Sequence, residues 1–204
     1  MIQVEYMKGM NIKMEKQTHF FFALKLPAST KQLLKEHCAR LKESLQFQRW
    51  VHHEDFHITL AFLGFAPSNQ LEAAINNVEE TIPGFGSLHL KINRLGIFGK
   101  QDSPRIFFAD TEVSNELQLV RQRVYTACIE AGFTLETRPF RPHLTLARKW
   151  VGEKPFQREM LDVWNKLQSE PIAFKGTEIA LYQTHLDKTP KYEEVKLFSL
   201  ENYK

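Results

Sequence analysis

The chain has 204 residues, 43% of them apolar, and carries a formal net charge of +3. A chain of this length buries roughly 70% of the surface that it exposes when unfolded, so it can form a core without disulfide or metal cross-links. The small net charge excludes a histone-like or strongly membrane-seeking protein, but it allows a local basic pocket for an anion. No segment approaches the roughly 20 apolar residues of a membrane-spanning helix.

The N-terminal segment and the cysteines set expectations about organisation and compartment. Residues 1–17 lack the apolar run of a signal peptide, so we expect a flexible N-terminal extension before a single domain that spans residues 18–204. The two cysteines, Cys38 and Cys128, are too few for a disulfide framework or a four-thiolate zinc site. We therefore expect buried, reduced thiols, a cytoplasmic location and no membrane association.

Strands and amphipathic helices alternate in the first half of the sequence. Residues 19–26 are rich in phenylalanine, and such a short apolar run is typical of a buried strand. Ser29, with Gln32 three positions later, resembles a capping box that begins a helix. A second helix is expected from Pro67-Ser68 onward. The other strands expected in this half cover residues 47–51, 57–63 and 88–98.

The second half continues the same alternation. Ser114 is a predicted N-cap for a helix, and Gly132 stands where a left-handed residue would end that helix. A weaker helix is expected over residues 157–168. The expected strands cover residues 105–113, 143–148, 179–185 and 193–200. Because no Gly-rich phosphate loop occurs, the elements indicate an α+β or mixed α/β fold without a dinucleotide or P-loop site.

One internal repeat links two distant strands. Residues 57–61 read His-Ile-Thr-Leu-Ala and residues 143–147 read His-Leu-Thr-Leu-Ala, 86 positions apart. Residues i and i+2 of a strand share a face, so each copy presents an imidazole beside a hydroxyl and turns its apolar side to the core. A single His-x-Thr carries little information, whereas two copies with shared flanks favour a functional site over coincidence.

Two such pairs around one cleft suit phosphoryl transfer on an ester. An imidazole pKa near 6.5 lets one histidine be neutral and the other protonated near pH 7. The neutral one of His57 and His143 can then deprotonate water while the other protonates the leaving oxygen. The hydroxyls of Thr59 and Thr145 can donate hydrogen bonds to phosphate oxygens. This scheme needs no metal and no cofactor.

The two motifs and their flanks resemble those of a known family. The motifs read HITLAFLG over residues 57–64 and FRPHLTLAR over residues 140–148, with further matches at RWV (49–51) and LGIF (95–98). They are similar to the signature of the two-histidine (2H) phosphoesterases. Within that superfamily the chain most resembles the bacterial and archaeal RNA 2′,3′-cyclic phosphodiesterases, historically called 2′-5′ RNA ligases. The resemblance covers nearly the whole chain from about Phe20.

The resemblance implies a bilobal α+β fold with a pseudo-two-fold axis, in which two antiparallel sheets line a central cleft and helices lie outside. It implies hydrolysis of RNA or nucleotide 2′,3′-cyclic phosphate ends to 2′-phosphomonoesters, with an associated reversible 2′-5′ ligation. By this likeness His57 protonates O3′ and His143 activates water, although the pseudo-symmetry allows the reverse order. Thr59 and Thr145 hold the phosphate. The expected partners are RNA 3′ ends or small cyclic nucleotides, and the expected protein is a monomer.

Arg148 and two residues at the second motif complete the candidate site. Arg148 matches a phosphate-binding arginine of the family, yet it stands five positions after His143, and a regular strand would point it to the other side. Either the strand bulges or ends just before it, or Arg148 reaches in from the rim or is a solvated surface residue. The first motif has Phe62 at the equivalent place. Arg141 and Phe140 are candidate rim residues for phosphate contact and base stacking, and structural roles suit them equally.

Other interpretations of the same residues lead to different functions. Residues 53–57 (HEDFH) match the His-Glu-x-x-His zinc motif, which requires a helix and a third ligand, with His89 and His185 as open choices. A module that binds nucleotide or RNA without catalysis would keep the same pocket. A third alternative is a 2H phosphodiesterase that acts on another small cyclic phosphate, such as ADP-ribose cyclic phosphate.

Overall fold

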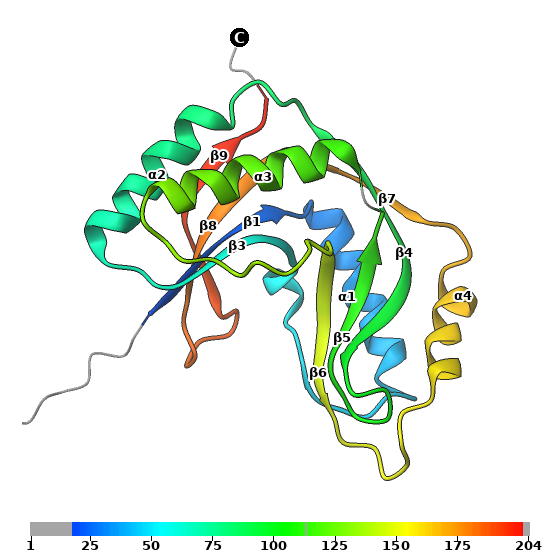
Figure 1. Ribbon diagram of the computed structural model, residues 1–204. Coiled ribbons are helices and arrows are strands. Elements are labelled where there is room, and N and C mark those ends of the chain that lie inside the picture. The colour runs from blue at the N-terminus through cyan, green and yellow to red at the C-terminus, as the bar shows by residue number, and fades with distance from the viewer. Residues whose placement is uncertain (1–17, 113, 202–204) are drawn as a thin grey trace, which may run out of the picture.

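The computed structural model describes residues 18–112 and 114–201, and Figure 1 shows the path of the chain. The predicted extension, residues 1–17, lies outside the described residues, as do Val113, the predicted end of one strand, and residues 202–204 of the predicted domain. The strands are β1 (His19–Lys25), β2 (Phe47–Trp50), β3 (His57–Phe65), β4 (Leu88–Gly99), β5 (Pro104–Thr111), β6 (His143–Trp150), β7 (Ile172–Gly176), β8 (Glu178–Thr184) and β9 (Tyr192–Ser199). The helices are α1 (Ala28–Leu41), α2 (Ser68–Thr81), α3 (Asn115–Glu130) and α4 (Val163–Leu167), with 3₁₀ turns η1 (His53–Asp55) and η2 (Arg158–Asp162).

The strands form two antiparallel sheets. The first sheet has the order β3-β1-β8-β9 and the second sheet the order β2-β6-β5-β4-β7. The two repeat strands belong to different sheets, because β3 is an edge of the first and β6 lies inside the second. β3 and β6 contact each other, so the sheets meet along the repeat. The expected α+β architecture of two antiparallel sheets with helices outside them is confirmed.

The helices pack against the two sheets, and the sheets share one hydrophobic core. α2 and α3 pack on each other and α3 contacts β3, so both cover the first sheet (Figure 1). α1 lies with the second sheet, because His37 contacts the Trp164 ring of α4 and Lys42 at the end of α1 lies over the Trp50 ring of β2. Thus α1 leaves the first sheet to cover the second, and α3 leaves the second to cover the first. One buried cluster accordingly contains Ile58 of β3 and Leu144 of β6.

No helix in the described part of the chain is long and apolar enough to cross a membrane. The two cysteines are free and buried, as predicted, and burial raises the pKa of each thiol to about 12. Both side chains therefore stay protonated at neutral pH and act as apolar core residues.

Two of the predicted helix ends are confirmed and one is wrong. Ser114 Oγ accepts a hydrogen bond of 3.0 Å from the backbone N–H three positions later, and Gly132 with φ +91° follows the end of α3, so both predicted ends are confirmed. The capping box at Ser29 is wrong, because α1 begins directly after Pro27 and no side chain caps it. The proline ring holds φ at −58°, and its carbonyl accepts the N–H of Lys31 at 3.0 Å, so the helix starts without a hydroxyl.

Two elements near the C-terminus differ from expectation. The helix expected over residues 157–168 is the 3₁₀ turn η2 followed by the five-residue α4. Strand β7 was not predicted. It has only five residues and two buried large side chains, Ile172 and Phe174, so its alternation is too short to stand out in the sequence.

The N-cap of α3 offers a stability test with a matched control. Ser114→Ala removes the acceptor for one N–H of the first turn, and we expect the free energy of unfolding to fall by about 1 kcal/mol. Ser29→Ala changes an exposed first-turn serine of α1 that caps nothing, and should alter the free energy by less than about 0.5 kcal/mol. Urea unfolding at pH 7 measures both. Equal losses from the two variants would contradict these cap assignments.

Candidate active site

Both repeat strands carry a β-bulge at the same position of the motif. The ladder of β1 with β3 shifts register opposite Leu60, and the ladder of β5 with β6 shifts register opposite Leu146. Each bulge places two consecutive motif residues, Leu-Ala, in the core. The alternation of faces therefore changes by one position after the bulge in both strands.

The bulge in β6 turns Arg148 to the face that carries His143 and Thr145. All three side chains are half-buried, whereas the leucines between them are buried. Burial raises the pKa of Tyr192, and the Arg148 guanidinium lies close enough to lower it. After desolvation, which is the main cause, its charge also lowers the pKa of His57 and of His143. Of the alternatives left open by the sequence, the structure therefore selects the bulge, and it brings Arg148 to both histidines.

His57 is held at both ring nitrogens. Its Nδ1–H donates to the backbone carbonyl oxygen of Asp55 at 2.8 Å, since a carbonyl can only accept. The neutral ring then carries its lone pair on Nε2, which accepts a hydrogen bond of 3.1 Å from the hydroxyl of Thr59. His57 and Thr59 thus share one face of β3, as the strand spacing predicts.

His143 repeats this arrangement in the second sheet. Its Nδ1–H donates to the carbonyl oxygen of Arg141 at 2.8 Å, again two residues earlier in the chain. Both imidazoles therefore have the same tautomer, with the proton on Nδ1 and the lone pair on Nε2. Thr145 lies two positions further along β6, and like His143 it is half-buried.

The surroundings of each imidazole lower its pKa. Desolvation is the main cause that lowers the pKa of His57 to about 4, and positive charge at His143 lowers it further. Desolvation also lowers the pKa of His143, against which its hydrogen bond to the Arg141 carbonyl and the charge of Asp110 act. Both rings are therefore neutral at pH 7, and they lie within electrostatic reach of one another.

Aromatic rings form a wall around His57. The centroid of its ring lies 4.7 Å from that of Phe21, 5.2 Å from that of Tyr192 and 5.9 Å from that of Tyr182. Phe21 and Tyr182 are register partners on β1 and β8, and Tyr192 begins β9. These rings exclude water from one side of the imidazole, which explains why desolvation dominates its pKa.

A second aromatic pair supports His143. Its ring centroid lies 4.9 Å from that of Phe98 and 5.3 Å from that of Phe108, and these two rings stack at 4.3 Å. Gly96 permits the stack, because a Cβ there would lie 2.4 Å from the Phe108 ring. The guanidinium of Arg141 lies 5.1 Å from each of the two phenyl centroids. Arg141, a predicted rim residue, therefore borders the His143 side of the site.

Asp55 connects the loop before β3 to the start of β9. Its buried carboxylate accepts backbone N–H groups from Lys191 at 3.0 Å and from Tyr192 at 3.1 Å. Its carbonyl oxygen meanwhile accepts the Nδ1–H of His57. Hydrogen bonds to a carboxylate are among the stronger ones, so a single residue positions both the imidazole and one ring of its wall.

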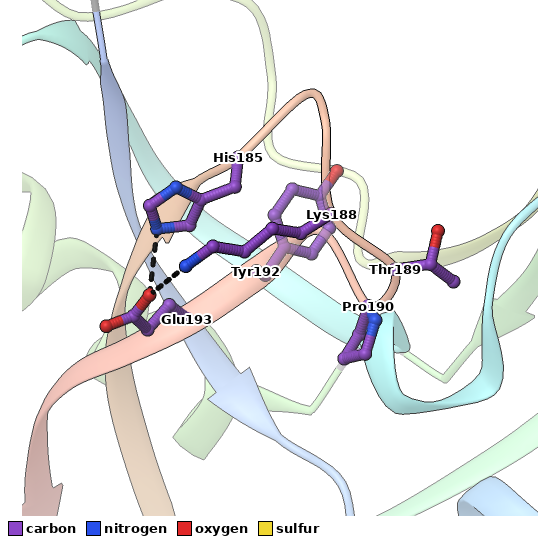
Figure 2. Close-up of a pocket in the computed structure, with 6 residues that line it drawn as sticks. All are labelled: His185, Lys188, Thr189, Pro190, Tyr192 and Glu193. Carbon is purple, nitrogen blue, oxygen red and sulfur yellow. Dashed lines mark hydrogen bonds and ion pairs between the residues drawn. The ribbon is translucent and has the colours of Figure 1, made fainter.

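Tyr192 also lines a pocket of about 500 Å³ in the loop between β8 and β9 (Figure 2). Within this pocket the Glu193 carboxylate lies 2.9 Å from Nε2 of His185 and forms an ion pair of 2.9 Å with Lys188. His185, an open choice for a third zinc ligand, therefore faces a carboxylate. The residues that line the pocket are His185, Lys188, Thr189, Pro190, Tyr192 and Glu193.

The structure places two other sequence candidates elsewhere. Phe140 packs against the core, and the Arg121 guanidinium of α3 lies 5.5 Å from its ring centroid. The zinc interpretation is wrong, because His53 lies in a 3₁₀ turn and His57 in a strand, so residues 53–57 do not form the required helix. Among the described residues, no group of three or more His, Cys, Asp or Glu side chains could hold a metal ion.

Sequence reasoning missed most of the residues that surround the histidines. Phe21, Tyr182 and Tyr192 reach His57 through the antiparallel register of strands that are far apart in sequence. Asp55 had a usable signal, because it precedes the first motif histidine by two positions, as Arg141 precedes His143. Only a comparison of the positions that lie two residues before each motif histidine would have revealed this role.

The pKa of His57 makes stability depend on pH. The imidazole is neutral in both states above pH 6.5, and below that pH the unfolded chain takes up its proton first. The lowered pKa in the folded state therefore means that stability is complete above pH 6.5 and is lost as the pH falls towards 4. We expect a loss of about 3 kcal/mol from this group.

His57→Gln removes this titration and leaves the other histidines in place. Urea unfolding of both proteins at pH 7 and pH 4 measures the effect. The wild-type protein should lose about 3 kcal/mol more than the variant over this interval. Parallel losses in the two proteins would show that His57 is not desolvated in the folded state.

Comparison with known proteins agrees with the fold and the motifs. A family model of the 2′-5′ RNA ligase superfamily matches residues 26–188. RNA 2′,3′-cyclic phosphodiesterase of Geobacillus stearothermophilus is 40% identical over 185 residues, which cover 91% of this chain and 58% of that protein. The protein of the same name from Bacillus subtilis is 32% identical over 182 residues, 89% of this chain and 96% of its own length. This chain thus spans less than two thirds of the first relative and nearly all of the second.

Solved structures share the architecture. The crystal structure of E. coli LigT complexed with 3′-AMP has a TM-score of 0.70 and 21% sequence identity, and the match covers 90% of this chain and 98% of that one. A crystal structure described as a phosphoesterase also has a TM-score of 0.70, at 20% identity. The extent of the family match and the sequence identity to the Geobacillus and Bacillus proteins place this chain in the 2′-5′ RNA ligase superfamily of 2H phosphoesterases.

Proposed function

We propose that this protein hydrolyses the 2′,3′-cyclic phosphate ends of RNA or nucleotides to 2′-phosphomonoesters by general acid–base catalysis. The observation that supports the proposal is the contact between β3 and β6, the strands that begin with His57 and His143, together with the matching Nδ1–H bonds of the two rings. The name shared by the Geobacillus and Bacillus relatives supports the same substrate. We also propose that the protein acts as a cytoplasmic monomer through one domain that spans residues 18–204.

The two imidazoles can supply both proton transfers of the reaction. A water oxygen attacks phosphorus, the P–O3′ bond breaks, and the phosphate stays on O2′. One Nε2 accepts the proton of the attacking water, and the protonated partner donates its own proton to O3′. After the reaction the two rings have exchanged protonation states, and exchange with solvent restores them.

Thr59, Thr145 and Arg148 are the groups proposed to hold the phosphate. Hydroxyl and guanidinium donors aimed at the non-bridging oxygens stabilise the charge that builds up there. In the free protein the Thr59 hydroxyl is bonded to Nε2 of His57. Substrate binding must redirect that hydroxyl to the phosphate, and this frees the Nε2 atom for proton transfer.

The histidine that acts as the acid must gain a proton when the substrate binds. Both rings are neutral at pH 7 in the free protein because desolvation lowers their pKa values. A bound phosphate anion has the opposite effect and raises the pKa of a nearby imidazole. The resemblance to the family gives the acid role to His57, whose pKa of about 4 then requires the larger rise.

Replacing either histidine tests the proposal. His57→Ala and His143→Ala should each lower the turnover of an oligonucleotide with a 2′,3′-cyclic phosphate end by roughly 10²- to 10⁴-fold, because each removes one proton transfer. Chromatography of the product should identify a 2′-phosphomonoester. His89→Ala, an exposed histidine on β4, is the matched control and should retain wild-type turnover.

Two outcomes would reject this assignment. Turnover by both variants at the wild-type rate would remove the histidines from the mechanism. Tight binding of a 2′-phosphorylated nucleotide by a wild-type protein that hydrolyses no cyclic phosphate would instead identify a non-catalytic binding module.

A further inference from the structure

Most cationic side chains around the two histidines are accompanied by a carboxylate. Asp110 lies 2.9 Å from Nε of Arg94 and 3.9 Å from the guanidinium of Arg141. On the other sheet, Lys25 is paired with Glu194 at 3.0 Å. On these sides of the site, positive charge is therefore compensated within the protein.

Arg49 and Arg148 form an exception. They are register partners on β2 and β6, so their side chains leave the same face of neighbouring strands, which lie roughly 4.8 Å apart. In the described ranges no carboxylate forms an ion pair with either guanidinium. Like charges directly opposite each other across a ladder are destabilising. This pair is therefore suited to a bound anion.

Arg49 lies close to the site but outside its central groups. Tyr192 contacts the His57 ring at 5.2 Å. Burial is the main cause that raises the pKa of Tyr192, and the charges of Arg148 and Arg49 both lower it, so both guanidiniums reach the same phenol. β2 is an edge of the second sheet, and Arg49 is exposed on it. A ligand that extends past Arg148 in this direction meets Arg49 and then solvent.

We propose that Arg49 forms a subsite for the phosphate group that precedes the terminal nucleotide of an RNA chain, next to the cyclic phosphate held at Arg148. This inference rests on the proposed function and adds a specificity determinant to it. A guanidinium suits the role because its planar donors match the oxygens of a phosphodiester. The enzyme then prefers a chain of two or more nucleotides with a cyclic end over a cyclic mononucleotide.

Three substrates distinguish the contribution of the upstream phosphate to kcat/KM from that of chain length. The first is 2′,3′-cyclic AMP, which has no upstream phosphate. The second is the adenosine dinucleotide with a 2′,3′-cyclic phosphate end. The third is the same dinucleotide with an uncharged methylphosphonate linkage, which keeps the length and removes the charge. The proteins compared are wild type, Arg49→Gln and the matched control Arg123→Gln, which removes an exposed arginine from α3.

Arg49→Gln should lower kcat/KM for the charged dinucleotide at least tenfold, as expected for the loss of a hydrogen bond between charged groups. It should leave kcat/KM for the mononucleotide and for the methylphosphonate within about twofold of wild type. The salt dependence should also weaken, with the slope of log kcat/KM against log salt reduced by about 0.7 for the charged dinucleotide. Arg123→Gln should change none of these values.

Each other result overturns the subsite. An equal fall on all three substrates would place Arg49 at the reacting phosphate, and no fall on any would remove it from binding. A wild-type protein that turns over none of the three would refute the proposed function itself, and the subsite with it.

Discussion

The site depends on one repeated hydrogen bond, from the Nδ1–H of a motif histidine to the carbonyl oxygen two residues earlier. In each half of the molecule this bond is 2.8 Å long, at Asp55 for His57 and at Arg141 for His143. A carbonyl oxygen cannot donate, so the bond leaves each neutral ring with its lone pair on Nε2. An imidazole free to take the other tautomer would present an N–H there and could not accept a proton from water.

The packing of the sheets is what makes this local bond useful. β3 and β6 belong to different sheets and touch, while α1 and α3 each cross to cover the sheet that they did not come from. A relative shift of the sheets would therefore disturb the common core that contains Ile58 and Leu144. The burial that positions the imidazoles is also the main reason that their pKa values are lowered. Position and protonation state thus have the same physical origin.

Much of the fold could be predicted from the sequence, because most elements have strong local patterns. The repeat at residues 57–61 and 143–147 predicted two strands with histidine and threonine on one face, and the bond between His57 and Thr59 shows that face directly. The sequence left a bulge before Arg148 as one of several alternatives and could not choose among them, since leucine and alanine suit a buried position in a regular strand as well as in a bulged one. The face of β6 on which the Arg148 side chain lies depends on the bulge opposite Leu146.

Contacts between strands account for most of what the sequence did not reveal. The ring wall of His57 requires the register of β1, β3, β8 and β9, and no pattern within a single strand contains that information. The same applies to Arg49, which becomes the neighbour of Arg148 only through the pairing of β2 with β6. β7 was missed for a different reason, its shortness.

Two imidazoles held in the same geometry can act as acid and base when their surroundings give them different pKa values. The surroundings of His57 and His143 differ in this way, although the two motifs are otherwise pseudo-symmetric. Phe62 and Arg148 follow equivalent bulges, yet Phe62 is uncharged and 54% exposed, so of the two motifs only the second supplies a cation at this position. His57 lies among three aromatic rings, whereas the charge of Asp110 acts on His143. An arginine in place of Phe62 would make the two halves more alike, but it would add a positive charge near His57 and lower the pKa of that imidazole still further. The departure from symmetry therefore spares the more strongly desolvated imidazole a further barrier to protonation, as the acid role proposed for it requires.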